Sequence, residues 1–155
     1  MEQLMDDMKH FPTFAQMAAI LRITPEGLDS KRKVAISADL LKELISRCVA
    51  HLDFDEKWYL SKYPDVKEAW EKGQIKNLRE HFIVSGYFEG RMPCEFPVDE
   101  KWYLNKYEDV RSAVASGKVT SAVQHYFKNG QFEFRSPCAS LDSSMKRWAR
   151  LTSQS

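Results

Sequence analysis

The sequence has few of the features that would place it outside the ordinary folded proteins. Only 6 Gly and 6 Pro occur among its 155 residues, which excludes collagen-like and linker-like chains. Lys and Arg number 23 against 22 Asp and Glu, giving a net charge of +1, whereas a general electrostatic nucleic-acid binder is far more basic. Hydrophobic residues make up 43% of the chain, which argues against disorder.

Signals that direct a protein to a membrane or out of the cell are also missing. No apolar run approaches the roughly 20 residues that span a bilayer. The acidic start, from Met1 to Asp7, lacks the basic-then-apolar order of a signal peptide. The 3 cysteines are an odd count, which fits a reducing compartment better than a disulfide framework. We therefore expect a cytoplasmic protein without a transmembrane segment.

What the sequence does contain is an internal repeat. The segment that begins DEKWYL at Asp55 returns at Asp99, with about 19 of about 40 positions identical at an offset of about 44 residues. The duplication divides the chain into four parts. They are an N-terminal segment (1–53), repeat one (54–97), repeat two (98–138) and a polar C-terminal tail (139–155).

Each repeat carries signals for three short helices. Asp55 is a good N-cap for the first helix, and Pro64 suits the first position of the second, which Gly73 ends. Asn77 can cap a third helix that ends at Gly86. No alternating apolar and polar run is long enough to favour a strand. With further helices in 1–53, we predict an all-α fold, an N-terminal helical segment packed on two tandem three-helix repeats.

The repeated pattern, D-E-x-W-Y-L-x-x-Y-P-D-V followed by H-[FY]-x-x-x-G and E-G-R-x-P, resembles a short helical module of bacterial proteins. That module occurs singly or in tandem, often beside glycosyltransferase or methyltransferase domains of surface-polysaccharide and other cell-envelope systems. The residues that carry the resemblance are Trp58, Tyr59, Leu60, Pro64, Asp65, Val66, Gly73, His81, Gly86, Glu89, Gly90, Arg91 and Pro93. The resemblance covers about half of the chain, and it implies an accessory or interaction unit without an activity of its own.

Repeat two departs from this pattern at two positions. Glu108 stands where the module has proline, so the break between its first two helices has a weaker signal. Phe134 stands where the module has glycine, and we expect the turn there to be remodelled.

A zinc site is one interpretation of the repeated His and Cys residues. His81 with Cys94, and His125 with Cys138, have identical spacing, and two His with two Cys can bind zinc tetrahedrally. However, the sequence has no close C-x-x-C or H-x-x-x-H pair, and duplication alone repeats any residue. We therefore favour structural histidines and predict no metal or other cofactor.

The repeated arginines and aromatic residues are the candidate binding residues. Arg91 and Arg135 could hold an anionic ligand, but ion pairs with Glu89 and Glu133 that fix the turn explain them more simply. The aromatic side chains could contact a protein or stack on a sugar, although core packing is favoured for most of them. Trp58 and Trp102, with the adjacent Tyr59 and Tyr103, are the candidates for such a contact because they lie near helix starts.

Two other function classes have weaker signals. Carboxylates such as Asp55 and Asp65 are already explained by helix capping and first-turn placement, and no nucleophile elbow, P-loop or dinucleotide fingerprint is present. We therefore predict that the protein is not an enzyme. Residues 14–28 faintly resemble a helix-turn-helix, but the second helix would carry acidic rather than basic side chains.

These observations favour a non-catalytic adaptor or regulator that binds a protein partner. The resemblance makes a glycosyltransferase or another envelope-biosynthesis enzyme the expected partner class, with self-association as a further option. The alternatives are a small DNA-binding regulator that uses residues 14–28 and a carbohydrate-binding or zinc-stabilised repeat.

Overall fold

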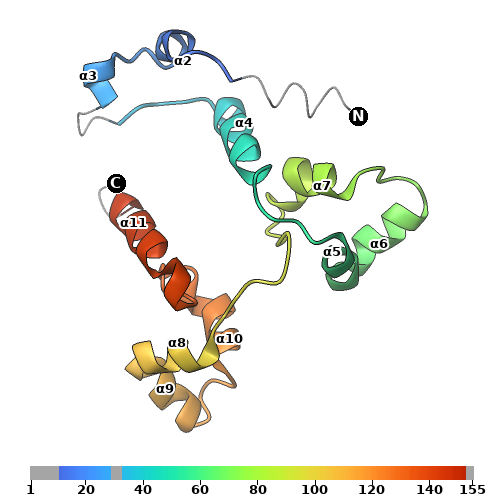
Figure 1. The fold of residues 1–155 in the computed structure, drawn as a ribbon, viewed down its shortest axis with the longest axis vertical. Coiled ribbons are helices and arrows are strands. Elements are labelled where there is room, and N and C mark those ends of the chain that lie inside the picture. Colours follow the sequence, from blue (N-terminus) through green and yellow to red (C-terminus); the bar gives the residue numbers. More distant parts are fainter. Residues whose placement is uncertain (1–10, 29–32, 153–155) are drawn as a thin grey trace. The chain divides into compact units, whose positions relative to one another are not determined.

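The structure is a computed structural model that describes residues 11–28 and 33–152 (Figure 1). Within these residues all regular secondary structure is helical, which confirms the all-α prediction. The chain divides into two compact units, Met1–Cys94 and Glu95–Ser155. No helix of the described residues is both long and apolar enough to cross a bilayer. The parts of the predicted N-terminal segment and tail at 1–10, 29–32 and 153–155 lie outside the described residues.

In the described part of the first unit, three helices precede repeat one. They are α2 (Phe14–Leu21), α3 (Pro25–Leu28) and α4 (Ala38–Val49). Thr13 caps α2 in a capping box with Gln16, and the Ser37 hydroxyl accepts the Leu40 N–H of α4 at 3.2 Å. The last turn of α4 buries Val49, and α4 packs against the π-helix of the repeat that follows.

Repeat one contains three α-helices and a π-helical turn. They are α5 (Glu56–Lys62), α6 (Pro64–Glu71), α7 (Leu78–His81) and the π-helix η1 (Phe82–Gly86). The Asp55 carboxylate accepts the Trp58 N–H at 2.9 Å, and the Asn77 side chain accepts the Glu80 N–H at 2.9 Å. Both predicted N-caps are therefore confirmed.

Repeat two, in the second unit, has the same order of elements. They are α8 (Glu100–Lys106), α9 (Glu108–Ala115), α10 (Ala122–His125) and the π-helix η2 (Tyr126–Gly130). The break between α8 and α9 falls at Tyr107 (φ −113°, ψ 92°), almost the same conformation as Tyr63 (φ −121°, ψ 88°) in repeat one. Glu108 in place of proline therefore does not remove the break. The Tyr107 hydroxyl accepts the Ser136 N–H at 2.8 Å, and this contact holds the side chain in place.

The segment predicted to be a polar tail forms a short 3-10 helix, η3 (Ala139–Leu141), and a final helix, α11 (Asp142–Thr152). The Asp142 carboxylate accepts the Ser136 hydroxyl at 2.6 Å and pairs with Lys106 at 2.8 Å. The start of α11 is therefore fixed to repeat two.

A tyrosine lies at the centre of each repeat's core. Tyr59 and Tyr103 are both 0% exposed. The core around Tyr59 includes Val49, Val66, Leu78, Phe82 and Ile83. The core around Tyr103 includes Val110, Ala122 and Tyr126. Each unit thus buries an apolar cluster of its own.

The tyrosine hydroxyl contacts both the third helix and the π-helix. Tyr59 Oη lies 3.2 Å from His81 Nδ1, and Tyr103 Oη lies 3.1 Å from His125 Nδ1. A Cβ atom on Gly86 would stand 2.3 Å from Tyr59 Oη, closer than real atoms approach. Glycine is therefore required here by the tyrosine, rather than by a left-handed backbone.

The turn after η2 keeps its shape although it lacks the glycine of repeat one. Gly90 has φ +78°, and Phe134 at the equivalent position has φ +52°. Both residues have a left-handed backbone conformation, so the expectation of a remodelled turn in repeat two is wrong. A left-handed backbone is unfavourable for a bulky residue by about 1–2 kcal/mol, and the surrounding contacts must offset this cost.

Substituting Gly86→Ala is expected to destabilise the protein by about 2 kcal/mol, because the new methyl group overlaps the Tyr59 hydroxyl. Tyr59→Phe removes that hydroxyl, so the double variant should be about 1 kcal/mol more stable than the sum of the single effects predicts. Urea unfolding of the four proteins measures this coupling. Gly90→Ala is the control: no atom lies within 4 Å of the added Cβ, so its cost of about 1–2 kcal/mol comes from the left-handed backbone alone and should be additive with Tyr59→Phe. Additive effects of Gly86→Ala and Tyr59→Phe would contradict the assignment.

Candidate interaction surface

The two repeated arginines bind carboxylates of their own unit. Arg91 donates two hydrogen bonds to the Asp65 carboxylate, at 3.0 and 2.7 Å, and a third to Glu89 at 2.8 Å. Its guanidinium also lies 5.0 Å from the centre of the Tyr63 ring. The predicted pair with Glu89 is present, but the forked contact with Asp65 is the larger interaction.

Repeat two has the same arrangement. Arg135 donates two hydrogen bonds to Asp109, at 2.9 and 2.8 Å, pairs with Glu133 and lies 4.9 Å from the Tyr107 ring. Only 21% of the Arg135 side chain is exposed. Both guanidinium groups are therefore engaged by two carboxylates and a ring, which leaves little of either for an anionic ligand.

Backbone hydrogen bonds also join the end of each repeat to its earlier residues. In repeat one, the Met92 N–H donates to the Tyr63 hydroxyl at 2.7 Å, and the Asp55 N–H donates to the Pro93 carbonyl at 3.0 Å. In repeat two, the Asp99 N–H donates to the Pro137 carbonyl at 3.1 Å. The chain that leaves each π-helix thus returns to the start of its own repeat.

The carboxylates in these forks are stabilised in their charged form. Hydrogen bonds from Arg91 hold the pKa of Asp65 below its ordinary value, and hydrogen bonds from Arg135 do the same for the pKa of Asp109. The pKa of each arginine is raised in turn, chiefly by its aspartate. These groups therefore remain ion pairs at neutral pH and are poorly suited to transferring protons.

Burial favours the uncharged forms of Tyr59, Tyr103 and His81 in the cores. It raises the pKa of Tyr59 and that of Tyr103 to about 12, and it lowers the pKa of His81. Burial likewise raises the pKa of the Cys94 thiol. None of these four groups has the shifted pKa of an activated base or nucleophile.

The candidate zinc ligands contact other protein groups. His81 and His125 each place Nδ1 on a tyrosine hydroxyl, and Cys138 Sγ lies 3.2 Å from Ser140 Oγ. Within residues 11–28 and 33–152, no group of three or more His, Cys, Asp or Glu side chains is arranged to hold a metal ion. The histidines instead contribute to the packing of the third helix on the first.

The aromatic residues proposed as contacts divide into two groups. Tyr59 and Tyr103 have no exposed surface, which corrects the expectation that they contact a partner or a sugar. Trp58 and Trp102 are half-buried. The Trp58 ring meets Tyr63 edge to face, with centroids 6.1 Å apart, and Lys106 Nζ lies 4.8 Å from the centre of the Trp102 ring.

Two exposed aromatic residues occupy equivalent positions in the turn after each π-helix. Phe88 is 41% exposed, and Phe132, at the same position of repeat two, is 74% exposed. Other exposed apolar side chains flank them, Val84 and Tyr87 in the first unit and Phe127 and Phe134 in the second. We call Phe88 and Phe132 the turn phenylalanines. The sequence predicts core packing for most of the repeated aromatic residues. The sequence signal that distinguishes the turn phenylalanines is their place in a turn that follows a glycine and precedes a proline.

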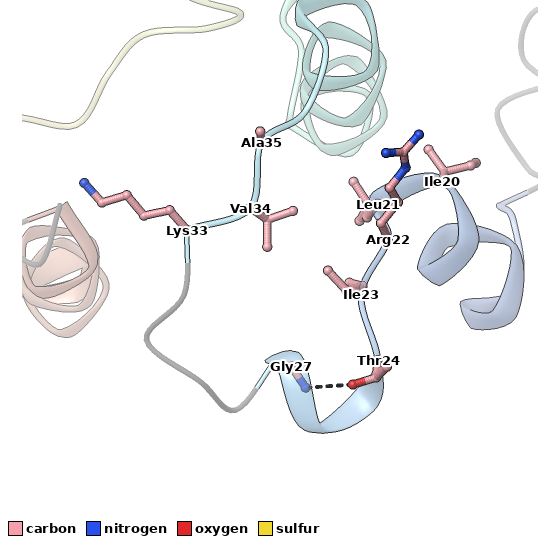
Figure 2. Close-up of a pocket in the computed structure, with 9 residues that line it drawn as sticks. All are labelled: Ile20, Leu21, Arg22, Ile23, Thr24, Gly27, Lys33, Val34 and Ala35. Carbon is pink, nitrogen blue, oxygen red and sulfur yellow. Dashed lines mark hydrogen bonds between the residues drawn. The ribbon is translucent and has the colours of Figure 1, made fainter.

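Two hollows occur in the first unit. One, of about 630 Å³, lies between α2, α3 and residues 33–35 (Figure 2). Its lining combines apolar residues such as Ile23 and Val34 with the basic residues Arg22 and Lys33, and the Gly27 N–H donates to Thr24 Oγ1 at its edge. The other, of about 550 Å³, is open and lies beside His81 and Asn77. Glu80 and Ser85 also line the second hollow, and His81 Nδ1 is engaged there by the Tyr59 hydroxyl at 3.2 Å.

The helices that resemble a helix-turn-helix are short. α2 ends at Leu21, and the left-handed backbone of Arg22 (φ 53°) makes the turn. The 4 described residues of α3 carry an acidic side chain, Glu26, in the first turn, which is poorly suited to contact bases in a major groove.

No protein-family model, curated protein or solved structure matches this chain.

The Arg91 fork predicts a specific dependence of stability on pH. Because the folded-state pKa of Asp65 is lowered, its stabilising contribution is complete above about pH 4, the ordinary carboxyl pKa, and disappears as the pH falls below that value. Asp65→Asn should lower the free energy of unfolding by about 1 kcal/mol at pH 6 and by much less at pH 3. Urea unfolding at the two pH values measures the difference.

Glu68→Gln serves as the control, since Glu68 forms an exposed pair with Lys72 one turn away on α6. This substitution should change stability by less than about 0.5 kcal/mol at either pH. An equal loss for Asp65→Asn at both pH values would show that the fork does not stabilise the unit.

Proposed function

We propose that this protein is a non-catalytic adaptor that binds a protein partner through the turn phenylalanines. The observation that carries the proposal is that Phe88 and Phe132 occupy the same position in two repeats and are both exposed. Large apolar side chains exposed with apolar neighbours are typical of protein contact sites. Aromatic residues also contribute strongly to such contacts when a partner buries them.

The internal use of the other repeated residues supports the same proposal. The tyrosine and histidine side chains contact each other in each core, and each arginine holds an aspartate of its own repeat. These contacts explain why both repeats retain those residues without a ligand. They do not explain a phenylalanine exposed to solvent, for which binding of a partner gives a reason.

The expected class of partner comes from the resemblance of the repeats to a module found beside glycosyltransferase and methyltransferase domains. We propose a glycosyltransferase or another enzyme of bacterial envelope-polysaccharide synthesis as the partner, met in the cytoplasm. Such an adaptor would hold an enzyme in place rather than act on its substrate.

Substituting both turn phenylalanines, Phe88→Ser and Phe132→Ser, should reduce recovery of the partner by about tenfold or more, since two exposed anchors are removed. The test is affinity capture of the tagged protein from its own cells after nuclease treatment, with mass spectrometry to identify and quantify what is recovered. Circular dichroism should be unchanged and the melting temperature should fall only slightly, because Phe132 is largely exposed and Phe88 loses only surface contacts with Tyr87 and Lys42.

Trp70→Ser is the matched control. Trp70 is 38% exposed on α6 and, like the turn phenylalanines, is an exposed aromatic side chain. A stoichiometric enzyme recovered with the wild type and with Trp70→Ser, but not with the double variant, would support the proposal. Equal recovery with all three proteins would contradict it, and recovery of the tagged protein alone would favour a sugar ligand or self-association.

A further inference from the structure

The last helix, α11, has an apolar face and a basic face. At about 100° per residue, Met145, Trp148 and Leu151 lie on one side of the helix, and Lys146, Arg147 and Arg150 lie on the other. Trp148 and Leu151 are 58% and 60% exposed. The apolar face is therefore largely open to solvent along the second half of α11.

The start of α11 is held firmly, so the exposed face belongs to a positioned helix. Asp142 accepts a hydrogen bond from Ser136 and pairs with Lys106 and Lys146, both at 2.8 Å. These contacts lower the pKa of Asp142 strongly. Among the described residues the main contacts of α11 are with η3. Most of the length of α11 extends away from α8, α9 and α10 (Figure 1).

Most of the charged side chains of α11 are basic. Its residues include three basic side chains and a single acidic one, Asp142, which Lys106 already compensates. The chain as a whole has a net charge of only +1. The basic character of α11 is therefore a local feature that selects a negatively charged surface.

We propose that α11 binds an anionic lipid surface. Helices that lie in a membrane interface are polar over much of their surface but keep their apolar residues on one face and their basic residues on another, as α11 does. Trp148 and Leu151 would enter the boundary between headgroups and acyl chains, where tryptophan is favoured.

The positions of the basic residues favour lipid over a protein groove. By helical spacing, Arg147 lies beside Leu151 at one edge of the apolar face, and Lys146 and Arg150 lie farther round the helix. From there their long side chains can reach the lipid phosphates while the apolar face is buried. The 11 residues of α11 span about 16 Å, which suits a helix lying on a bilayer and is too short for one crossing it.

The experiment is co-sedimentation of the full chain with vesicles. One set contains phosphatidylcholine with about 30% phosphatidylglycerol, and the other contains phosphatidylcholine alone. Binding is expected to the anionic vesicles only and should fall about tenfold or more between about 0.1 and 0.5 M salt. Trp148→Ser with Leu151→Ser should weaken it by about tenfold through loss of the apolar face. Arg147→Glu should weaken it by at least about fivefold through charge alone.

Trp70→Ser is the control, because Trp70 is also an exposed tryptophan, on a helix whose charges are mixed. It should bind as the wild type does. Failure of the wild type to bind anionic vesicles would overturn the proposal, and so would unchanged binding of the Trp148 and Leu151 variant. Salt-sensitive retention of DNA that competes with the vesicles and survives the loss of Trp148 and Leu151 would assign the basic face to nucleic acid instead.

Discussion

The contact between a tyrosine hydroxyl and a glycine backbone is the constraint on which each repeat depends. Tyr59 Oη occupies the space that a side chain at residue 86 would need, and the same hydroxyl meets His81 at 3.2 Å. The first helix can therefore lie directly against the end of the third. The third helix widens at this point into a π-helical turn, in which the Tyr87 N–H donates to the Phe82 carbonyl at 2.8 Å. Removing the glycine would separate these elements.

The arginine forks add a second constraint, because they join the end of each repeat to its own middle. Arg91 reaches back to Asp65 across the start of α6, and the Pro93 carbonyl accepts the N–H of Asp55, the residue that caps α5. Repeats of a solenoid usually need neighbours to bury their apolar faces. Here each unit buries an apolar cluster of its own. Contacts within the unit therefore provide burial of the kind that a solenoid repeat obtains from its neighbours.

The structural features that the sequence predicted correctly are those that depend on residues close together in the chain. Asp55 and Asn77 cap helices because their side chains reach backbone N–H groups three residues ahead, and such contacts follow from the sequence alone. The break at Tyr107 has no proline and depends on a contact with residue 136, so its cause could not be read locally. The same holds for the pairing of Arg91 with Asp65, which are 26 residues apart. Duplication could have indicated that pair, since Arg135 and Asp109 keep the same separation.

The candidate surface was harder to predict because duplication preserves structural and functional residues alike. Tyr59 and Phe88 are both repeated aromatic residues, and only exposure distinguishes the buried one from the exposed one. Each repeat uses its tyrosine for folding, so the pair of exposed phenylalanines is what remains to be explained by binding. Under the proposed function, two equivalent contact sites on one chain would raise the effective concentration of the second site once the first is bound. A weak contact made by each unit would then hold a partner with two matching sites, and this would be a physical reason for keeping two copies of a unit that closes on itself.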